Sequence, residues 1–209
     1  QDNLDDTASK ITAWAWIKNR DRAYPNAEDY VLVDRVRGIF KVIPSNETDA
    51  ETTEPNTVQR FFQRGVQVGS ETNVNRSGDS HVLWQWLLGD SATTGSTTSP
   101  AGSLASTSIV ADAGHFAVIS YTGNATSGAT IGHGMSAAPE MLWVKERDNA
   151  NGFIVSSTVI GFDKILRLDT TDDETGDAGA FNSTAPSATL ITLGSNNGTN
   201  RSSGKMICY

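Results

Sequence analysis

Residues 16–21 read Trp-Ile-Lys-Asn-Arg-Asp, and 127 residues further on residues 143–148 read Trp-Val-Lys-Glu-Arg-Asp. Each stretch is an apolar run that ends in a charged Lys-x-Arg-Asp turn, a pattern typical of a strand that leaves a sheet. The same pattern at two distant places indicates an internal repeat, so the fold has to be sought in two related units.

Four further landmarks follow in the same order in both copies, 123 to 126 residues apart. They are Gly38 and Lys41 with Gly161 and Lys164, Gly69-Ser70 with Gly194-Ser195, residues 75–77 with residues 200–202 (Asn-Arg-Ser in both), and Gly78 with Gly204. Alternating apolar residues between these landmarks, such as Val31 and Val33, predict half-buried antiparallel strands. No helix longer than a turn or two is expected.

The predicted fold is all-β, with two related antiparallel β-sandwich units in tandem. The units are residues 12–90 and 114–209, and a polar segment (1–11) precedes them. A Ser/Thr/Gly linker (91–113) joins them, because 17 of the 18 residues from 91 to 108 are Ser, Thr, Gly, Ala or Pro. The second unit opens with the strand-like stretch 116–121, and the first has no counterpart. We therefore expect an uncovered strand edge in the first unit, to be covered by residues 104–110 or by a neighbouring chain.

The composition excludes several classes of protein. Among the 209 residues, 44 are Ser or Thr, and the net charge of -8 disfavours polyanions, so nucleic acid is not an expected partner. The single cysteine, Cys208, rules out an intrachain disulfide and a cysteine-based zinc site. The longest apolar stretch, residues 82–88, is too short to cross a membrane, and no signal peptide is evident, so a processed or partial chain with no membrane partner is expected.

Several stretches of both copies together carry a family resemblance. They are residues 16–21, 32–38 (Leu-Val-Asp-Arg-Val-Arg-Gly), 74–79 (Val-Asn-Arg-Ser-Gly-Asp), 84–86 (Trp-Gln-Trp), 120–124 (Ser-Tyr-Thr-Gly-Asn) and 132–134 (Gly-His-Gly). These motifs resemble a repeat found in structural and tail-fibre-like proteins of marine tailed bacteriophages. The resemblance implies concanavalin-like or laminin-G-like (jelly-roll) units, a non-enzymatic structural role in the tail or tail fibre, a location in the virion and other virion proteins as partners. Together with the missing opening strands of the first unit, it predicts a homo-oligomer, most plausibly a trimer, with that unit near the interface.

The sequence predicts no catalytic, cofactor-binding or metal site. His133 lies in a Gly-His-Gly turn, which we expect to be structural rather than a metal ligand or general base, and neither His81 nor His115 lies near an Asp or Ser in a triad-like pattern. The acidic run 169–177 lacks the glycine and glutamate spacing of an EF-hand loop. We expect a solvated crossing loop there, with calcium binding as the alternative. The six Asn-x-Ser/Thr sequences, at Asn46, Asn75, Asn124, Asn182, Asn197 and Asn200, are expected to be turns.

Tryptophans at alternate positions suggest either a core or a sugar-binding platform. Trp14 and Trp16, and likewise Trp84 and Trp86, project from one face of a strand. Because Trp143 repeats Trp16, packing is the preferred interpretation, and a lectin-like module for host-surface glycans is the alternative function. A polysaccharide depolymerase is a third class, although the Glu-x-Asp-x-Glu motif of glucanases with this fold is missing. A surface Trp pair over a groove would favour glycan binding. Two facing carboxylates would favour cleavage, and a large apolar subunit interface would favour assembly.

Overall fold

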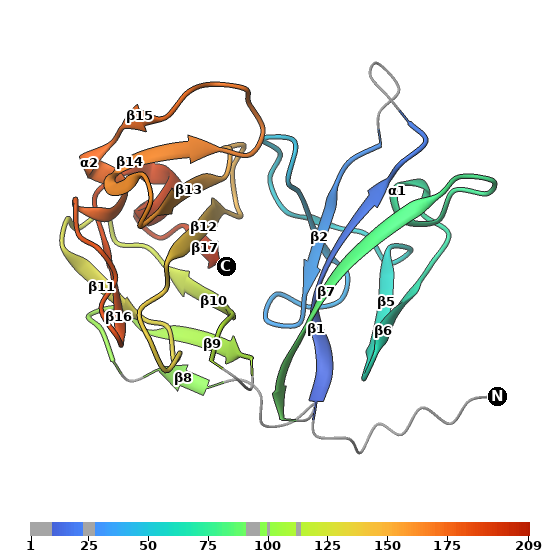
Figure 1. Cartoon of the computed structure of the whole chain (residues 1–209), viewed down its shortest axis with the longest axis horizontal. Coiled ribbons are helices and arrows are strands. Elements are labelled where there is room, and N and C mark those ends of the chain that lie inside the picture. The colour runs from blue at the N-terminus through green and yellow to red at the C-terminus, as the bar shows by residue number, and fades with distance from the viewer. Residues whose placement is uncertain (1–9, 23–27, 91–96, 100, 112–113) are drawn as a thin grey trace.

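The computed structural model describes residues 10–22, 28–90, 97–99, 101–111 and 114–209 (Figure 1). These residues form two large sheets, two two-stranded ribbons and three one-turn helices, with every strand pair antiparallel. The all-β prediction is therefore confirmed. No helix of the described residues is long and apolar enough to cross a membrane.

The first half of the chain forms a five-stranded sheet with strand order β4-β3-β2-β1-β7, together with the ribbon β5-β6 and helix α1. Their bounds are β1 (Lys10–Asn19), β2 (Val31–Asp34), β3 (Lys41–Pro44), β4 (Thr52–Thr53), β5 (Val58–Phe62), β6 (Gly65–Val68), α1 (Thr72–Asn75) and β7 (His81–Asp90).

The second half forms an eight-stranded sheet with strand order β15-β14-β13-β12-β17-β10-β9-β8, the ribbon β11-β16 and two helices. Their bounds are β8 (Thr97–Ser99), β9 (Ser106–Val110), β10 (Ala117–Thr122), β11 (Ala129–Gly132), β12 (Met141–Glu146), β13 (Ile154–Ser157), β14 (Gly161–Arg167), β15 (Thr175–Gly176), α2 (Ala178–Phe181), β16 (Leu190–Leu193), α3 (Asn197–Asn200) and β17 (Lys205–Cys208).

Five strands follow the same order in both sheets. The series β4-β3-β2-β1-β7 in the first half has the series β15-β14-β13-β12-β17 as its counterpart in the second. Trp16 lies on β1 and Trp143 on β12, which occupy the same place in the two series. Beyond β17 the second sheet continues through β10, β9 and β8, whereas the first ends at β7.

The landmark residues make equivalent hydrogen bonds in the two halves. Gly69 follows β6 and Gly194 follows β16, and the carbonyl oxygen of each accepts a 2.7 Å hydrogen bond from a side-chain amide, that of Asn75 or Asn200. A Cβ on either glycine would lie within 2.3 Å of a backbone oxygen. Only glycine fits such a close approach of two backbones, which explains why both positions carry it.

The charged turns after β1 and β12 are likewise built alike. The amide of Arg20 donates to the carbonyl oxygen of Ser80 at 2.9 Å, and the amide of Arg147 donates to that of Lys205 at 2.8 Å. Each bond joins the turn to the beginning of the strand that pairs with β1 or β12. The repeated Lys-x-Arg-Asp sequence thus marks the same local structure twice.

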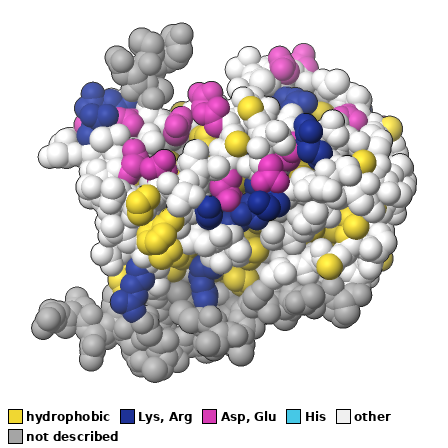
Figure 2. Space-filling view, turned by 180° about the vertical axis from the view of Figure 1, so that it is seen from behind, with side chains coloured by type: hydrophobic (Ala, Val, Ile, Leu, Met, Phe, Trp, Pro, Cys, Tyr) yellow, Lys and Arg dark blue, Asp and Glu magenta, His cyan; other side chains and the backbone are white. Residues whose placement is uncertain are grey.

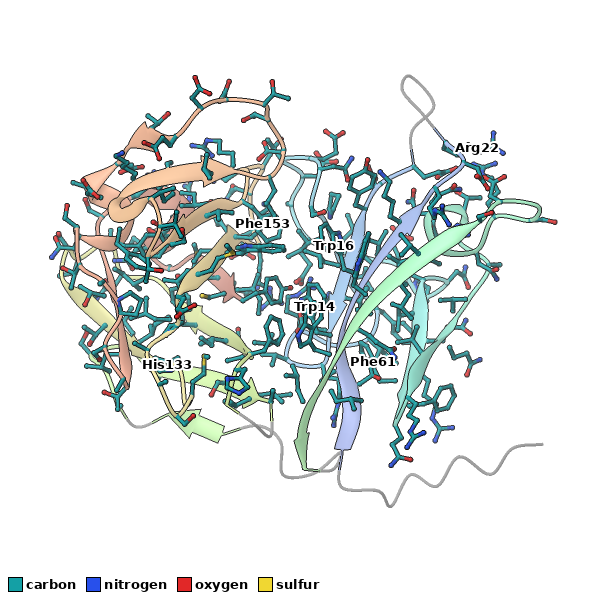
Figure 3. All side chains as sticks on the ribbon, viewed as in Figure 1. Trp14, Trp16, Arg22, Phe61, His133 and Phe153 are labelled. Carbon is teal, nitrogen blue, oxygen red and sulfur yellow. The ribbon has the colours of Figure 1, made fainter. Side chains whose placement is uncertain are left out.

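Three apolar cores separate four layers (Figure 1). One core lies between β5-β6 and the five-stranded sheet and includes Ile17 and Phe61. A second, with Phe181, lies between the eight-stranded sheet and β11-β16. The third lies between the two large sheets, where Trp14 of the first half and Phe153 of the second belong to one cluster (Figure 3). The two halves therefore pack face to face, as the sheets of a β-sandwich do.

Burial differs from the sequence prediction in the central strands. All four residues of β2 and all four of β13 are buried, so the expectation of half-buried strands is wrong there. The physical reason is that each large sheet is covered on both faces, since Val31 and Val33 face one core and Leu32 the other. Alternation of residue type cannot reveal this, because both faces are apolar.

The range 91–113, expected to be a linker, contributes two strands. β8 and β9 extend the eight-stranded sheet, and β9 pairs with β10 rather than with the first half. Small hydroxyl residues are compatible with this because the buried Ser106 side chain donates to the carbonyl oxygen of Gly132 at 2.8 Å, while Ile109 fills the core between the sheets. Residues 91–96, 100 and 112–113 of this range, and residues 1–9 of the N-terminal segment, lie outside the described residues.

Candidate functional site

Four tryptophans form one wall of the space between the two large sheets. In the β1/β7 ladder Trp14 pairs with Trp86 and Trp16 with Trp84, so all four side chains lie on the same face of the five-stranded sheet. The ring centroids of Trp14 and Trp86 are 4.8 Å apart and those of Trp16 and Trp84 are 4.9 Å apart. The period-two spacing in the sequence is the direct cause of this cluster.

The inner and outer tryptophans differ in exposure. Trp14 is 2% exposed and its indole N–H has no partner among the described residues, whereas Trp84 and Trp86 on β7 are each 40% exposed. Trp16 is anchored because its N–H donates to the Ser45 hydroxyl at 2.9 Å. The wall thus has a fixed inner part and an accessible outer part.

The opposite wall comes from the second half. Phe116, just before β10, stacks on Trp86 at 5.3 Å between centroids, and Trp143 on β12 meets Trp16 edge-on at 5.7 Å. Tyr209 packs edge-on against Trp14 at 5.9 Å. Such edge-to-face and offset contacts each add stability beyond the area that they bury.

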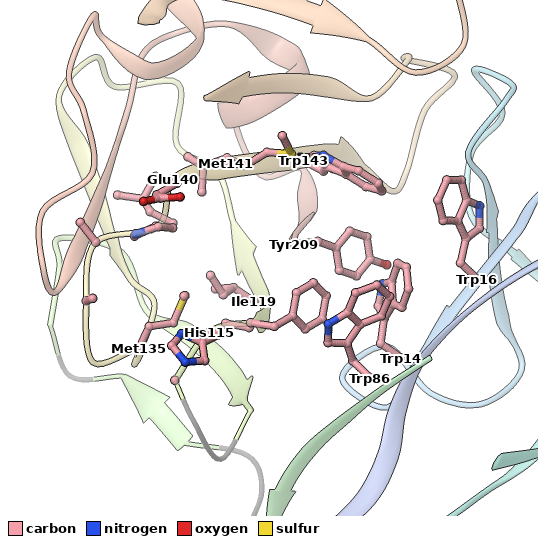
Figure 4. A pocket seen from close by; sticks show the side chains of 18 of the residues that line it. Trp14, Trp16, Trp86, His115, Ile119, Met135, Glu140, Met141, Trp143 and Tyr209 are labelled. Carbon is pink, nitrogen blue, oxygen red and sulfur yellow. Dashed lines mark hydrogen bonds between the residues drawn. The ribbon is translucent and has the colours of Figure 1, made fainter. Parts of the chain in front are cut away.

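A cleft of about 740 Å³ opens between these walls (Figure 4). Aliphatic residues line its depth, among them Ile119, Met135 and Leu142. Its two titratable side chains besides Tyr209, His115 and Glu140, are exposed. A cleft of this size with an aromatic wall and few charges suits an apolar or ring-shaped ligand, or an extended peptide.

Polar contacts fix the two halves around the cleft. The Tyr209 hydroxyl donates to a carboxylate oxygen of Asp34 at 2.8 Å, and the same carboxylate pairs with the buried guanidinium of Arg37. Burial alone would lower the pKa of Arg37, but the charge of Asp34 raises it above its ordinary value. Burial raises the pKa of Tyr209, so its hydroxyl keeps the proton that it donates.

A second polar junction centres on Glu51. Its carboxylate accepts two hydrogen bonds from Arg147, at 2.8 and 2.9 Å, and a third from Arg37 at 3.3 Å. Figure 2 shows acidic and basic side chains next to one another on the rear face, so the described residues of that face do not form a field of one sign. The bidentate pairing of Arg147 with Glu51 fixes the orientation of the two side chains as well as the distance between them.

One buried cation also bridges the halves. Lys145 has no exposed surface, and its ammonium group donates to the carbonyl oxygens of Thr48 (3.3 Å), Glu146 (2.8 Å) and Asn149 (3.3 Å). Burial lowers its pKa to about 8, against the opposing effect of nearby carboxylates such as Glu146. The sequence repeats this lysine as Lys18, but nothing in the repeat signals that only the second copy is buried.

The comparisons with known proteins give one match. A family model described as Domain of unknown function (DUF7483) matches residues 6–209. The chain belongs to this family. No curated protein and no solved structure matches it.

In this DUF7483 chain the three histidines lie apart from one another. His133 is buried: its Nδ1 accepts from the amide of Met135 at 3.1 Å, and its Nε2 lies 3.2 Å from the carbonyl oxygen of Ser187. Burial lowers its pKa, with the Ser187 carbonyl opposing the shift. His133 therefore holds the segment that follows β11. His115 lies at the cleft, and His81 begins β7.

The acidic run 169–177 covers the loop after β14, the short strand β15 and the residue before α2. Glu174 pairs with Lys164 at 2.5 Å, and Asp177 accepts from the Asn196 side chain at 2.6 Å. Among the residues that the structure describes, no group of three His, Cys, Asp or Glu side chains is placed to hold a metal ion. Calcium binding by this loop stays the weaker alternative.

Proposed function

We propose that the chain is a non-enzymatic structural component of a tailed-bacteriophage particle, of the tail or tail-fibre type, with other virion proteins as partners. The resemblance of its repeated motifs to those of phage structural proteins supports this proposal. The same resemblance supports a location in the virion. Neither nucleic acid nor a membrane is among the proposed partners.

The proposal includes two related antiparallel β-sandwich (concanavalin-like jelly-roll) units in tandem. Its support is the common strand order of the two large sheets and the matching hydrogen bonds at Gly69 and Gly194. Each large sheet is backed by its own two-stranded ribbon, and these ribbons enclose separate cores. The shared core between the sheets then joins the units into one body.

The exposed outer edge of β7 is the observation that supports a role in assembly. This strand is ten residues long and ends the five-stranded sheet, whereas β10 covers the corresponding edge of β17 in the second half. Leu83, Trp84, Trp86 and Leu87 are between 38% and 42% exposed, and no charged residue or proline lies between 82 and 89. Monomeric proteins protect long edges with charges, prolines or bulges. The β1/β7 ladder has register shifts near its Lys10 end, but residues 82–89 carry neither charge nor proline, so this edge suits a subunit interface. We propose a homo-oligomer, a trimer, with the first half at the interface.

Multi-angle light scattering of the purified chain tests the oligomer. We expect a trimer at micromolar concentration, and a monomer for the variant carrying both Leu83→Lys and Leu87→Lys, with an unchanged circular dichroism spectrum. The control is Val159→Lys, since Val159 is 91% exposed but lies on the turn between β13 and β14. A wild-type chain that is monomeric at this concentration contradicts the proposal.

A second candidate function is the binding of host-surface glycans. The observation that favours it is the pair Trp84 and Trp86, each 40% exposed beside the cleft. The C–H groups of a pyranose ring carry partial positive charge and pack on the electron-rich face of an indole. Each indole also carries an N–H group that can donate to a sugar hydroxyl.

Calorimetric titration with cellohexaose and chitohexaose tests the glycan function. Binding that is lost in Trp86→Ala and kept in Phe40→Ala would support it, since Phe40 is 38% exposed and does not line the cleft. No heat of binding from either sugar would count against it.

A further inference from the structure

The connection between β11 and β12 is held in place by one histidine. β11 belongs to a two-stranded ribbon and β12 to the eight-stranded sheet, so residues 133–140 cross from one layer of the second half to the other. His133 is the first residue of this connection and has no exposed surface (Figure 3). Two residues later, Met135 packs against the core between these layers and also lines the cleft.

The hydrogen bonds of the His133 ring require its neutral form. A backbone amide can only donate, so Nδ1 of the ring accepts from the Met135 amide, 3.1 Å away, and carries no proton. The proton of the neutral ring is therefore on Nε2, which donates to the carbonyl oxygen of Ser187 at 3.2 Å. Gly134 has a φ of +73°, a conformation that glycine adopts readily in the tight turn between the ring and the Met135 amide.

A second proton on the ring has no acceptor in this arrangement. A proton on Nδ1 would point at the N–H group of Met135, which is itself a donor. The positive charge of the imidazolium would also lie in a buried site, where an unpaired charge is costly. Protonation therefore requires a conformation in which the Met135 amide has left the ring.

The described elements packed around His133 offer no carboxylate to a charged ring. They are β11 with its continuation, β16 with the turn before it, and β9, whose Ser106 donates to the carbonyl oxygen of Gly132. Apart from His133 itself, these stretches contain no titratable side chain, as the sequence shows for residues 101–111, 129–139 and 185–193.

The titratable groups further away do not compensate the charge either. Tyr121 and Cys208 belong to the core beneath the connection, and burial raises the pKa of each, so both are uncharged in acid. Glu140, at the far end of the connection, is exposed at the cleft. Burial accordingly lowers the pKa of His133 from its ordinary value of 6.5, with the Ser187 carbonyl opposing the shift.

We propose that His133 is an acid-sensitive latch, which holds residues 133–140 against the second half while its ring is neutral and releases them when its ring is protonated. The released segment includes part of one wall of the cleft, so acid changes the shape of the cleft while the large sheets stay folded. The proton comes from the solvent and returns to it when the pH rises, so the release is reversible.

The direction of the pH dependence follows from the two forms of the latch. The ring has its ordinary pKa in the released form and a lower pKa in the closed form, so the released form binds more protons between the two values. Each pH unit below 6.5 should therefore favour release about tenfold, until the lower pKa is reached. Above pH 6.5 the ring is neutral in both forms, and the equilibrium no longer depends on its titration.

Hydrogen exchange of the full chain, followed from about pH 7 to about pH 5, tests the proposal. After correction for the intrinsic exchange rate at each pH, the protection of the Met135 amide should fall by about tenfold per pH unit below 6.5. The amides of β10, which lies between β17 and β9, should keep their protection. A constant protection of Met135 over this range would overturn the proposal, and so would an equal loss of protection in β10, because that result means global unfolding.

Two variants identify the group that senses the pH. His133→Asn keeps a side-chain oxygen that accepts from the Met135 amide but does not titrate, so the protection of Met135 should no longer depend on pH. His115→Gln is the matched control, because it removes an exposed histidine and should keep the wild-type response. A response that persists in His133→Asn, or that is lost in His115→Gln, would overturn the proposal.

Nuclear magnetic resonance of the wild-type imidazole needs no variant and so covers the case in which His133→Asn does not fold. The ¹⁵N signals of His133 should show a neutral ring with its proton on Nε2 at neutral pH, and a pKa below 6.5. A ring that carries its proton on Nδ1, or that titrates at or above 6.5, would contradict the latch. None of these results depends on where the chain lies in a particle.

Discussion

Replacing Gly194 by alanine tests the repeated backbone contact most severely. An ideal Cβ at this position would lie 1.9 Å from the carbonyl oxygen of Gly179, although real Cβ atoms essentially never approach closer than 3.0 Å. The two backbones must therefore separate by about 1 Å. Two hydrogen bonds cross this contact, from Gly194 to Ala180 (3.0 Å) and from Asn196 to Gly179 (2.9 Å).

The cost follows from these two effects. Overpacking at a site that cannot relax costs about 1–3 kcal/mol, and weakening two backbone hydrogen bonds adds about 1–2 kcal/mol. We expect Gly194→Ala to lower the free energy of unfolding by roughly 3 kcal/mol. Gly69→Ala should behave alike and be somewhat milder, because its Cβ would lie 2.3 Å from the Asn56 oxygen.

Urea denaturation followed by circular dichroism measures both changes. The matched controls are Gly65→Ala and Gly176→Ala, since a Cβ at either position meets nothing within 4 Å and neither glycine has a positive φ. The controls should be unchanged or more stable by about 0.4–1 kcal/mol. A stability of Gly194→Ala within about 0.5 kcal/mol of wild type would refute the reasoning.

Three further outcomes are expected. Lys145→Met should destabilise by about 2 kcal/mol near pH 7. Because burial lowers the pKa of Lys145 from 10.5 to about 8, the unfolded chain binds more protons than the folded one between about pH 8 and 10.5, so in urea denaturation wild-type stability should rise relative to the variant within that window. Glu51→Ala should cost about 3 kcal/mol in the same assay, because it removes a partner from the buried Arg37, and an unchanged midpoint would contradict this. Adding a chelator should leave the melting temperature unchanged, and a fall of several degrees would instead favour calcium in the acidic loop.

The fold class could be read from the sequence because each repeated landmark has a local cause. Gly69 and Gly194 are required by a close backbone approach, and the Lys-x-Arg-Asp turns join the same pairs of strands. The packing of the two halves could not be predicted. This packing depends on contacts between residues far apart in sequence, such as Trp14, Leu32 and Phe153 in the core between the two large sheets. Residue type alone does not show which apolar face of one sheet packs against the other sheet.

The candidate site was foreseen only in its aromatic residues. The spacing of two residues predicted that Trp14 and Trp16 share one face of a strand, and that Trp84 and Trp86 do so too. The pairing of β1 with β7 brings these two pairs together. The cleft itself lies between the two large sheets, and the packing of these sheets joins strands that are distant in sequence. Burial of Lys145 in place of Lys18 arises from the same long-range packing.

Electron cryo-microscopy of purified particles tests the proposed function most directly. The account predicts density for this chain at repeated positions in the tail or tail fibre, with the β7 edge covered by a neighbouring subunit. Two results together would contradict the proposal: a reconstruction that accounts for every tail protein without this chain, and mass spectrometry of the particles that finds no peptide from it.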